Sequence, residues 1–187
     1  MQKTPQLIGL WSPAPGCGKS TVAEHIWRTK HAQIMPFAYT LKRMLDPVLI
    51  SAGYSDVERA HYLFSPEGKH KSLERLPGSP TPRRLMQTLG TEWGRFCVHG
   101  ELWVELWRSM VKTADSDYVI VDDVRFHNEA MAVRSLGGQL WCIKSSRVIT
   151  STEHISEGQL DDQPFDVILQ NDGTIEQLHA AVDCVLA

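Results

Sequence analysis

The chain has 187 residues, of which 42% are hydrophobic and 22% charged. This length suits one domain, or one domain with an insertion, and the hydrophobic fraction is enough for a sizeable core. A formal net charge of −3 argues against a protein that coats nucleic acid with a broad basic surface. The scattered cysteines form no CxxC pair, which argues against zinc ribbons and is typical of reduced thiols in a cytosol. The first residues predict neither a secretory signal nor a membrane span.

The first predicted element is a short apolar strand at residues 7–12, which meets a turn rich in Gly and Pro. Residues 19–31 have apolar side chains at helical spacing, and residues 33–38 predict a second short strand. The order of strand, glycine-rich loop and helix is the context that a phosphate-binding loop requires.

A helical region follows. Residues 39–53 predict a helix that Pro47 bends or ends. Residues 53–82 are polar and rich in Pro and Gly, and predict an exposed loop with short helical pieces. Residues 81–97 predict a helix with a Thr cap and Pro at its first position. Residues 101–114 predict another, with Leu102, Leu106 and Met110 on one side and Trp103 and Trp107 beside them.

The clearest strand is the apolar run at residues 118–121, typical of a strand buried on both faces. A helix (128–138), a strand (139–145), a polar connection, a last strand (165–171) and a last helix (172–187) follow. Strands that alternate with helices predict an α/β fold with a parallel sheet. The whole chain, 1–187, is then one domain, with its core at about 1–38 and 116–187, a helical insertion at about 39–115 and a lid at about 146–163.

The stretch GLWSPAPGCGKST, residues 9–21, nearly matches the phosphate-loop pattern G-x-x-x-x-G-K-[ST]. Pro13 stands where the first glycine is expected, and a proline can start such a turn with its fixed φ. Backbone N–H groups at a helix N-terminus converge on phosphate oxygens, Lys19 reaches the terminal phosphates and the Ser20 hydroxyl binds Mg²⁺. The predicted nucleotide-binding residues are Pro15, Gly16, Cys17, Gly18, Lys19, Ser20 and Thr21.

Asp122 and Asp123 follow the strand at 118–121, where a carboxylate holds magnesium directly or through water. A surface pair of aspartates at a strand end is the alternative. Several arginines occur near strand ends and in the helical insertion, and their planar guanidinium groups suit phosphates. A phosphate monoester acceptor is mostly a dianion at neutral pH and needs no general base. The arginines therefore favour a nucleoside monophosphate as acceptor.

Five stretches resemble the deoxynucleoside monophosphate kinases of tailed bacteriophages, in the order found in that family. They are GCGKSTVAEHI (16–26), FAYTLKRML (37–45), PRRLMQTLGTEWGR (82–95) followed by LWV (102–104), VIVDDVRFHNEA (119–130), and HISE with DVILQNDGTIEQL (154–178). The third and fourth stretches are more specific than the phosphate loop alone. Pro13 and Pro15 depart from the family's usual loop.

The resemblance implies a nucleoside monophosphate kinase fold: a five-stranded parallel sheet flanked by helices, a helical acceptor-binding insertion and a lid. It implies ATP with Mg²⁺ as donor and a deoxynucleoside monophosphate (dNMP) as acceptor, giving ADP and the diphosphate. It also implies that the protein acts in the cytoplasm, which is that of the host cell if the protein is phage-encoded. Neither a nucleic-acid polymer nor a membrane is expected as a partner, and a homodimer is compatible with the family.

Site residues carried over by position fall into three groups. Lys19, Arg125 and Arg147 act on the transferring phosphoryl group. Asp123 matches the metal-binding aspartate, with Asp122 as the second choice beside Ser20. The acceptor site consists of Lys42, Arg84, Gln87, Thr88 and Arg95, with Gln87 at the base edge.

Two other readings stay open. A kinase of the same fold that acts on a hydroxyl, such as one for dephospho-coenzyme A or a sugar acid, needs a base near its acceptor. A nucleotide-dependent switch would bind or hydrolyse ATP without regard to any acceptor.

Overall fold

The structure, a computed structural model, describes residues 4–148, 160 and 162–187. The chain forms two compact units: Met1–Phe37 together with Trp107–Ala187, and the continuous segment Ala38–Leu106. The predicted lid at 146–163 lies mostly outside the described residues. Every helix in the described part of the chain is too short or too polar to span a lipid bilayer.

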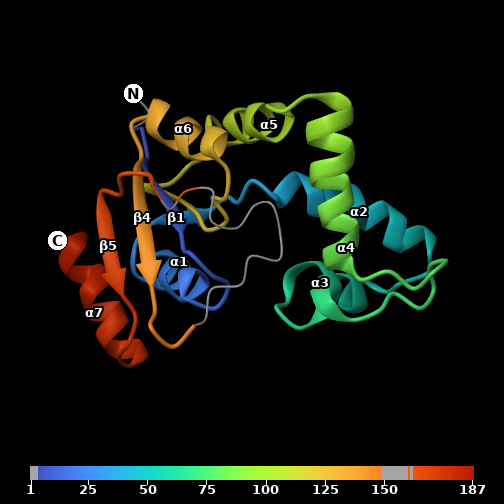
Figure 1. Cartoon of the computed structure of the whole chain (residues 1–187), viewed down its shortest axis with the longest axis horizontal. Coiled ribbons are helices and arrows are strands. Elements are labelled where there is room, and N and C mark those ends of the chain that lie inside the picture. Colours follow the sequence, from blue (N-terminus) through green and yellow to red (C-terminus); the bar gives the residue numbers. More distant parts are fainter. Residues whose placement is uncertain (1–3, 149–159, 161) are drawn as a thin grey trace. The chain divides into compact units, whose positions relative to one another are not determined.

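The first unit is built on a five-stranded sheet in the order β2-β3-β1-β4-β5, and every pairing in it is parallel (Figure 1). The predicted α/β fold class is confirmed. The strands are β1 (Gln6–Trp11), β2 (Ala32–Ile34), β3 (Tyr118–Val121), β4 (Gln139–Lys144) and β5 (Val167–Gln170). β2 is shorter than predicted.

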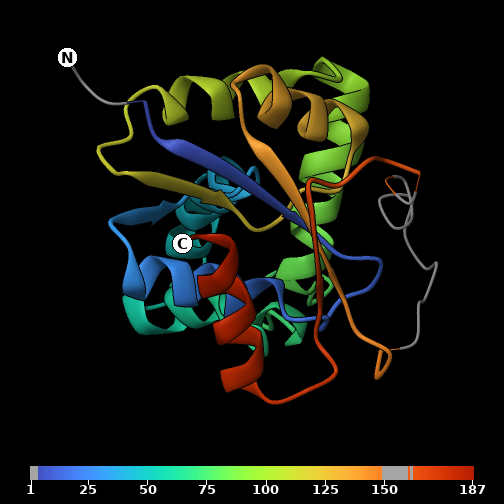
Figure 2. The same ribbon diagram turned by 90° about the vertical axis from the view of Figure 1, so that its left-hand side faces the viewer.

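Helices cover both faces of the sheet. They are α1 (Lys19–Thr29), α6 (His127–Ser135) and α7 (Ile175–Val185). Ile8 and Leu10 of β1 belong to the buried cluster that α1 and α7 complete. Gly9, between them, faces α6, where an added Cβ would lie 3.2 Å from Val133. In Figure 2 the orange α6 and the red α7 accordingly lie on opposite sides of the sheet.

The second unit is helical. Its elements are α2 (Tyr39–Ser51), α3 (Asp56–Phe64), the 3₁₀ turn η1 (Gly68–His70), α4 (Pro82–Gln87), the π-helical segment η2 (Thr88–Val98) and the start of α5 (Leu102–Val111). Pro47, predicted to bend or end this helix, lies inside α2 and does not end it. Thr81 caps α4 as predicted, because its side chain accepts a hydrogen bond from the N–H of Arg84.

In the segment 53–82, predicted to be an exposed loop with short helical pieces, the helical pieces are present as α3 and η1, but part of the segment is buried. Ser55 and Glu58 form a capping box that starts α3, a nine-residue helix. The side chains of Tyr54, Leu63 and Leu73 are buried in a cluster with Leu45 and Leu49 of α2. Only these few, widely spaced apolar residues attach the segment to the core, so the residues between them can be polar.

The buried face of α5 is the one that carries its two tryptophans. Trp103, Val104 and Trp107 are buried, whereas Leu106 is 40% exposed. Large indoles can be buried when the ring N–H finds an acceptor. Trp103 Nε1 donates to the carbonyl of Gly90 at 2.7 Å, and Trp107 Nε1 to the carbonyl of Met35 at 2.8 Å. These two hydrogen bonds set the buried face.

Candidate active site

The loop between β1 and α1 makes two left-handed turns. Gly16 has φ +85° and Gly18 has φ +108°, a region that side chains other than glycine rarely occupy. Among the described residues, Ser79 is the only non-glycine residue with positive φ. Pro13, with its ring-restricted negative φ, therefore stands at a position that needs no glycine. The departure from the usual pattern leaves the two turns of the loop intact.

Asn171, which directly follows β5, is hydrogen-bonded to the loop between β1 and α1. Its Nδ2 donates to the carbonyl of Cys17 at 2.9 Å. A Cβ on Gly18 would lie only 2.5 Å from that same Nδ2. Asn171 was not predicted as a site residue, although open α/β sheets bind their ligands at the carboxyl ends of their strands.

Lys19 lies at the centre of a charged cluster. Its Nζ donates to Ser12 Oγ, which in turn donates to the carbonyl of Ala14 at 2.7 Å. Burial lowers the pKa of Lys19, Arg125 lowers it further, and Cys17 and the two aspartates oppose this shift. Lys19 therefore experiences the charges of Arg125 and of both aspartates.

Asp122 and Asp123 follow β3, which pairs directly with β1. Asp123 Oδ1 accepts a hydrogen bond from the N–H of Phe37 at 2.8 Å, so this carboxylate also anchors the chain after β2. The side chain of Ser20 is exposed in the first turn of α1. No group of three or more His, Cys, Asp or Glu side chains suited to a metal occurs within the described residues.

The two predicted catalytic arginines are both exposed. The backbone N–H of Arg125 donates to Oε2 of the buried Glu129 at 2.8 Å, which fixes the main chain at the start of α6. Arg147 Nη2 donates to the carbonyls of Asn171 at 2.9 Å and Gly173 at 3.0 Å. Arg147 is thus held against the same β5–α7 loop that contacts the phosphate loop.

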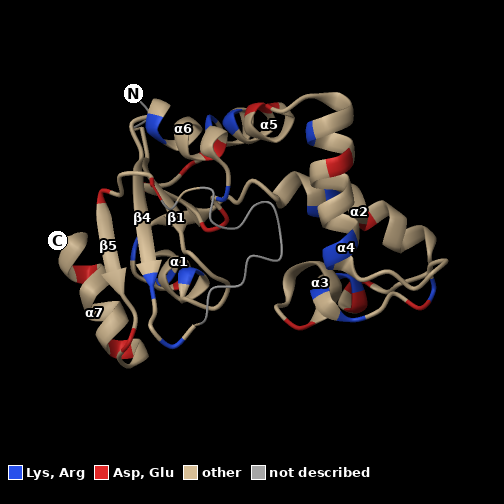
Figure 3. Ribbon diagram, viewed as in Figure 1, with Lys and Arg blue, Asp and Glu red and all other residues tan. Residues whose placement is uncertain are grey.

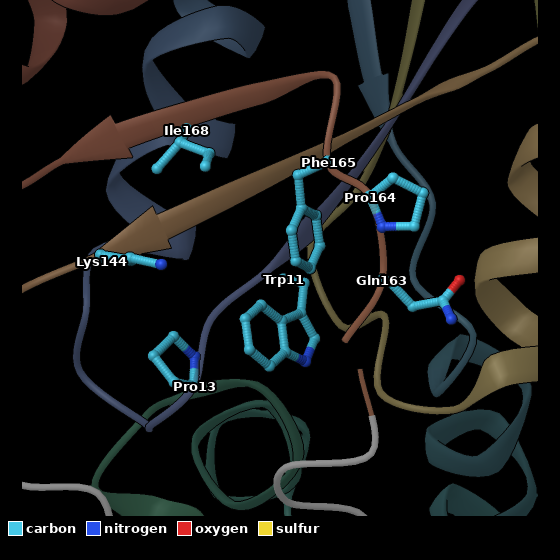
Figure 4. A pocket seen from close by; sticks show the side chains of 7 residues that line it. All are labelled: Trp11, Pro13, Lys144, Gln163, Pro164, Phe165 and Ile168. Atoms are coloured by element: carbon cyan, nitrogen blue, oxygen red, sulfur yellow. The ribbon is translucent and has the colours of Figure 1, made fainter. Parts of the chain in front are cut away.

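A pocket of about 610 Å³ lies beside Pro13, at the start of the loop between β1 and α1 (Figure 4). Its lining residues are Trp11, Pro13, Lys144, Gln163, Pro164, Phe165 and Ile168. The rings of Trp11 and Phe165 stack with their centroids 5.0 Å apart. This stacking fixes the end of β1, from which the phosphate loop starts. Pro13 faces this pocket, whereas the glycine turns come after it.

The five predicted acceptor residues all belong to the helical unit, on α2, α4 and η2. Figure 3 shows the basic residues of α4. Arg84 Nη2 lies 3.7 Å from Glu92 Oε1, and the hydroxyl of Thr88 donates to the carbonyl of Arg84 at 3.1 Å. Gln87 ends α4.

Two further candidates have partners within the same unit. Lys42 Nζ lies over the ring of Phe64, 5.1 Å from its centroid. Arg95 Nη1 donates to the carbonyl of Gly100 at 3.3 Å. Phe64 is 58% exposed, and its place beside Lys42 was not foreseen from the sequence because it depends on how α2 and α3 pack.

Comparison with known proteins identifies the family. Residues 67–182 match the family described as Deoxynucleotide monophosphate kinase. The chain belongs to this family. The matched residues include α4, η2 and β3, together with Arg125 and Arg147. They do not include the loop between β1 and α1.

Several relatives are named for the same activity. The Deoxynucleotide monophosphate kinase of Escherichia phage RB69 is 26% identical over 140 residues, covering 73% of this chain and 56% of that protein. The chain thus spans little more than half the length of the RB69 kinase. A relative from Acanthamoeba polyphaga mimivirus, provisionally named a deoxynucleotide monophosphate kinase, is 26% identical over 195 residues, covering 96% of this chain and 95% of the relative.

Among solved structures, TT1252 from Thermus thermophilus has a similar fold. The TM-score is 0.52 at 17% identity, and the match covers 98% of this chain and 97% of that one. This likeness concerns the fold alone, and it extends over nearly the whole chain, including the segment before residue 67.

Proposed function

We propose that this chain transfers the γ-phosphoryl group of ATP to a deoxynucleoside monophosphate, giving ADP and a deoxynucleoside diphosphate. One observation supports the proposal: Lys19 follows a loop with glycines at positive φ and is subject to the charges of Asp122, Asp123 and Arg125, in a chain of the deoxynucleotide monophosphate kinase family. A loop of this kind serves phosphate binding, and the family describes the acceptor.

In the proposed reaction an oxygen of the acceptor phosphate attacks the γ-phosphorus, and the bond from that phosphorus to the β–γ bridging oxygen breaks. The backbone N–H groups of the loop and the N-terminus of α1 bind the donor phosphates. Lys19 holds the β- and γ-phosphate oxygens, and Arg125 and Arg147 offset the charge that spreads over the transferred group. The acceptor phosphate is already an anion, so the step requires no general base.

Ser20 with Asp123 or Asp122 fits a magnesium site, because a hydroxyl and carboxylates are the hard oxygen ligands that this ion takes. The charges of both carboxylates raise the pKa of Lys19, against the larger effect of burial, and this supports a metal site near the residue that would contact the nucleotide phosphates. Magnesium bound there would neutralise charge on the β- and γ-phosphates.

For the acceptor we propose the five residues of the helical unit. Lys42, Arg84 and Arg95 would bind the monophosphate, and Gln87 with Thr88 would contact the nucleoside. Gln87 has a donor and an acceptor on one planar group, which suits the edge of a base. We further propose that the segment 146–163 acts as a lid and that the enzyme works in the cytoplasm of a host cell. A homodimer, and the absence of nucleic-acid partners, stay predictions.

The decisive experiment incubates the protein with ATP, Mg²⁺ and each of the four dNMPs, and follows ADP. ADP that depends on one or more dNMPs is the expected result. Dephospho-coenzyme A and sugar acids belong in the same panel, because turnover with these alone would favour a kinase for hydroxyl acceptors. ADP release at one rate with every acceptor, and without any, would favour a nucleotide switch instead.

The two aspartates can be separated by substitution. Asp122→Asn and Asp123→Asn each remove one charge, and in the second variant the side-chain amide oxygen could still accept the N–H of Phe37. We expect the variant that loses a metal ligand to need at least about tenfold more Mg²⁺ for half-maximal activity. Titration of Mg²⁺ at fixed ATP is the measurement. Equal Mg²⁺ requirements in both variants and the wild type would remove both carboxylates from the metal site.

Asn171→Ala is expected to weaken ATP binding about tenfold, because the Cys17 carbonyl loses the hydrogen bond that holds the loop. Isothermal titration with a non-hydrolysable ATP analogue measures this. Gln170→Ala is the control. It removes a hydrogen bond of the same loop, to Asp172 at 2.6 Å, without touching the phosphate loop. Similar affinities in the two variants would show that Asn171 does not support nucleotide binding.

A further inference from the structure

The segment η2 is an unusual stretch of helix. It is π-helical over the 11 residues Thr88–Val98, and the N–H of His99 still bonds five residues back, to the carbonyl of Gly94 at 3.0 Å. Helices of this kind are rare, are usually a single turn long, and are found mostly at functional sites. η2 contains Thr88 and Arg95, two of the proposed acceptor residues. Something must keep this segment from forming the ordinary α-helix.

Trp103 is the side chain in a position to do so. It is 3% exposed, and its Nε1 donates to the carbonyl of Gly90 at 2.7 Å. In an α-helix that carbonyl would accept from the N–H of Gly94, one turn later. A side chain that bonds into the helix ladder is one of the known causes of helix distortion.

Gly94 makes room for the indole, and Gly90 makes room for a neighbour on α2. A Cβ on Gly94 would lie 2.4–2.5 Å from three atoms of the Trp103 ring, so the ring occupies the space that any other residue at 94 would fill. A Cβ on Gly90 would lie 3.2 Å from Leu41 of α2. Glycine is also the weakest helix former after proline, so Gly90 and Gly94 favour the ordinary α-helix less than other residues would.

Arg95 is held at the same end of the segment. Its Nη1 donates to the carbonyl of Gly100, in the turn that leads into α5 and Trp103. The widened helix and this contact together fix where the guanidinium group lies relative to Thr88.

We propose that Trp103 is a positioning residue for the acceptor: its indole N–H holds the Gly90 carbonyl, keeps η2 in the π form and thereby sets Thr88 and Arg95 for the monophosphate. This proposal rests on the function proposed above. Because a buried indole usually finds an acceptor for its N–H whatever its role, the substitutions below, and not the hydrogen bond itself, separate positioning from core filling.

The first test is Trp103→Phe, which keeps an aromatic ring and removes the N–H. We expect the KM for the preferred dNMP to rise at least about tenfold, as for misplaced substrate ligands, while the KM for ATP stays within about twofold. Trp107→Phe is the matched control on the same helix. It loses an equivalent hydrogen bond, to Met35 in the sheet unit, and is 1% exposed. It should lower the Tm without changing the KM for the dNMP.

A second test separates positioning from stability. Trp103→Leu should lower both Tm and acceptor affinity. Adding Gly94→Ala fills the vacated space with a better helix former, so the double variant should regain Tm. Its KM for the dNMP should nevertheless stay high, because the segment is free to become an α-helix.

The outcomes are distinct. Recovery of the KM together with the Tm in the double variant would overturn the proposal, as would an unchanged KM in Trp103→Phe. Absence of dNMP-dependent ADP in the wild type would instead overturn the proposed function itself.

Discussion

Lys19→Met is expected to lower kcat by about 10²- to 10³-fold, the loss typical of removing one preorganised group that stabilises transition-state charge. The folded chain should survive and its Tm should be equal or higher. Burial and Arg125 lower the pKa of Lys19, so the charged ammonium is held less favourably in the folded than in the unfolded chain. At neutral pH the charged lysine therefore costs stability, and methionine removes that cost.

The measurement combines steady-state kinetics with thermal unfolding. Lys112→Met, an exposed lysine of the same unit, is the control and should leave both kcat and Tm unchanged. A Lys19→Met variant with near wild-type kcat would show that the lysine does not contact the reacting phosphates. A collapse of the Tm would show instead that its bond to Ser12 is mainly structural.

Gly18→Ala is expected to have the second largest effect. At φ +108° an alanine is strained, and its Cβ would lie 2.5 Å from Asn171 Nδ2. The strain costs about 1–2 kcal/mol of stability, and relief of the clash moves Asn171 away from the loop. We expect ATP affinity to fall by at least about tenfold, since one or more loop contacts are lost.

Gly137→Ala separates backbone strain from the loop contact. Gly137 has φ +77° at the end of α6, with no atom within 4 Å of its Cβ position. It should lose similar stability in thermal unfolding and bind the ATP analogue as the wild type does. If both variants lose affinity equally, the effect of Gly18→Ala is a general loss of stability rather than a change in the loop.

The sheet was readable from the sequence because buried parallel strands are continuous apolar runs. The run at 118–121 corresponds to β3, and the order of elements predicted the parallel α/β fold. The glycines of the phosphate loop were also recognisable, because only Gly16 and Gly18 supply the positive φ that the turns need. Local chemistry decides these features, so one stretch of sequence is sufficient.

The features that escaped prediction depend on distant partners. Asn171 contacts a loop 154 positions earlier in the chain, and no local pattern marks it. The acceptors of the indole N–H groups of α5 are the carbonyls of Gly90 and Met35, which the spacing of residues within the helix does not identify. The π form of η2 likewise depends on the Trp103 ring in our proposal, although the sequence favours an ordinary helix there.

The order of the strands also has a consequence for synthesis on the ribosome. β1 pairs only with β3 and β4, and β2 pairs only with β3, among the strands of the described residues. The first 37 residues thus contain two strands that do not pair with each other. Both pair with β3, Tyr118–Val121, which is made much later in the chain. The continuous segment Ala38–Leu106 emerges complete before then, with its own buried cluster. Because domains generally fold as units in the order in which they are made, we expect the inserted unit to gain its core during translation, while β1 and β2 still lack their partner β3.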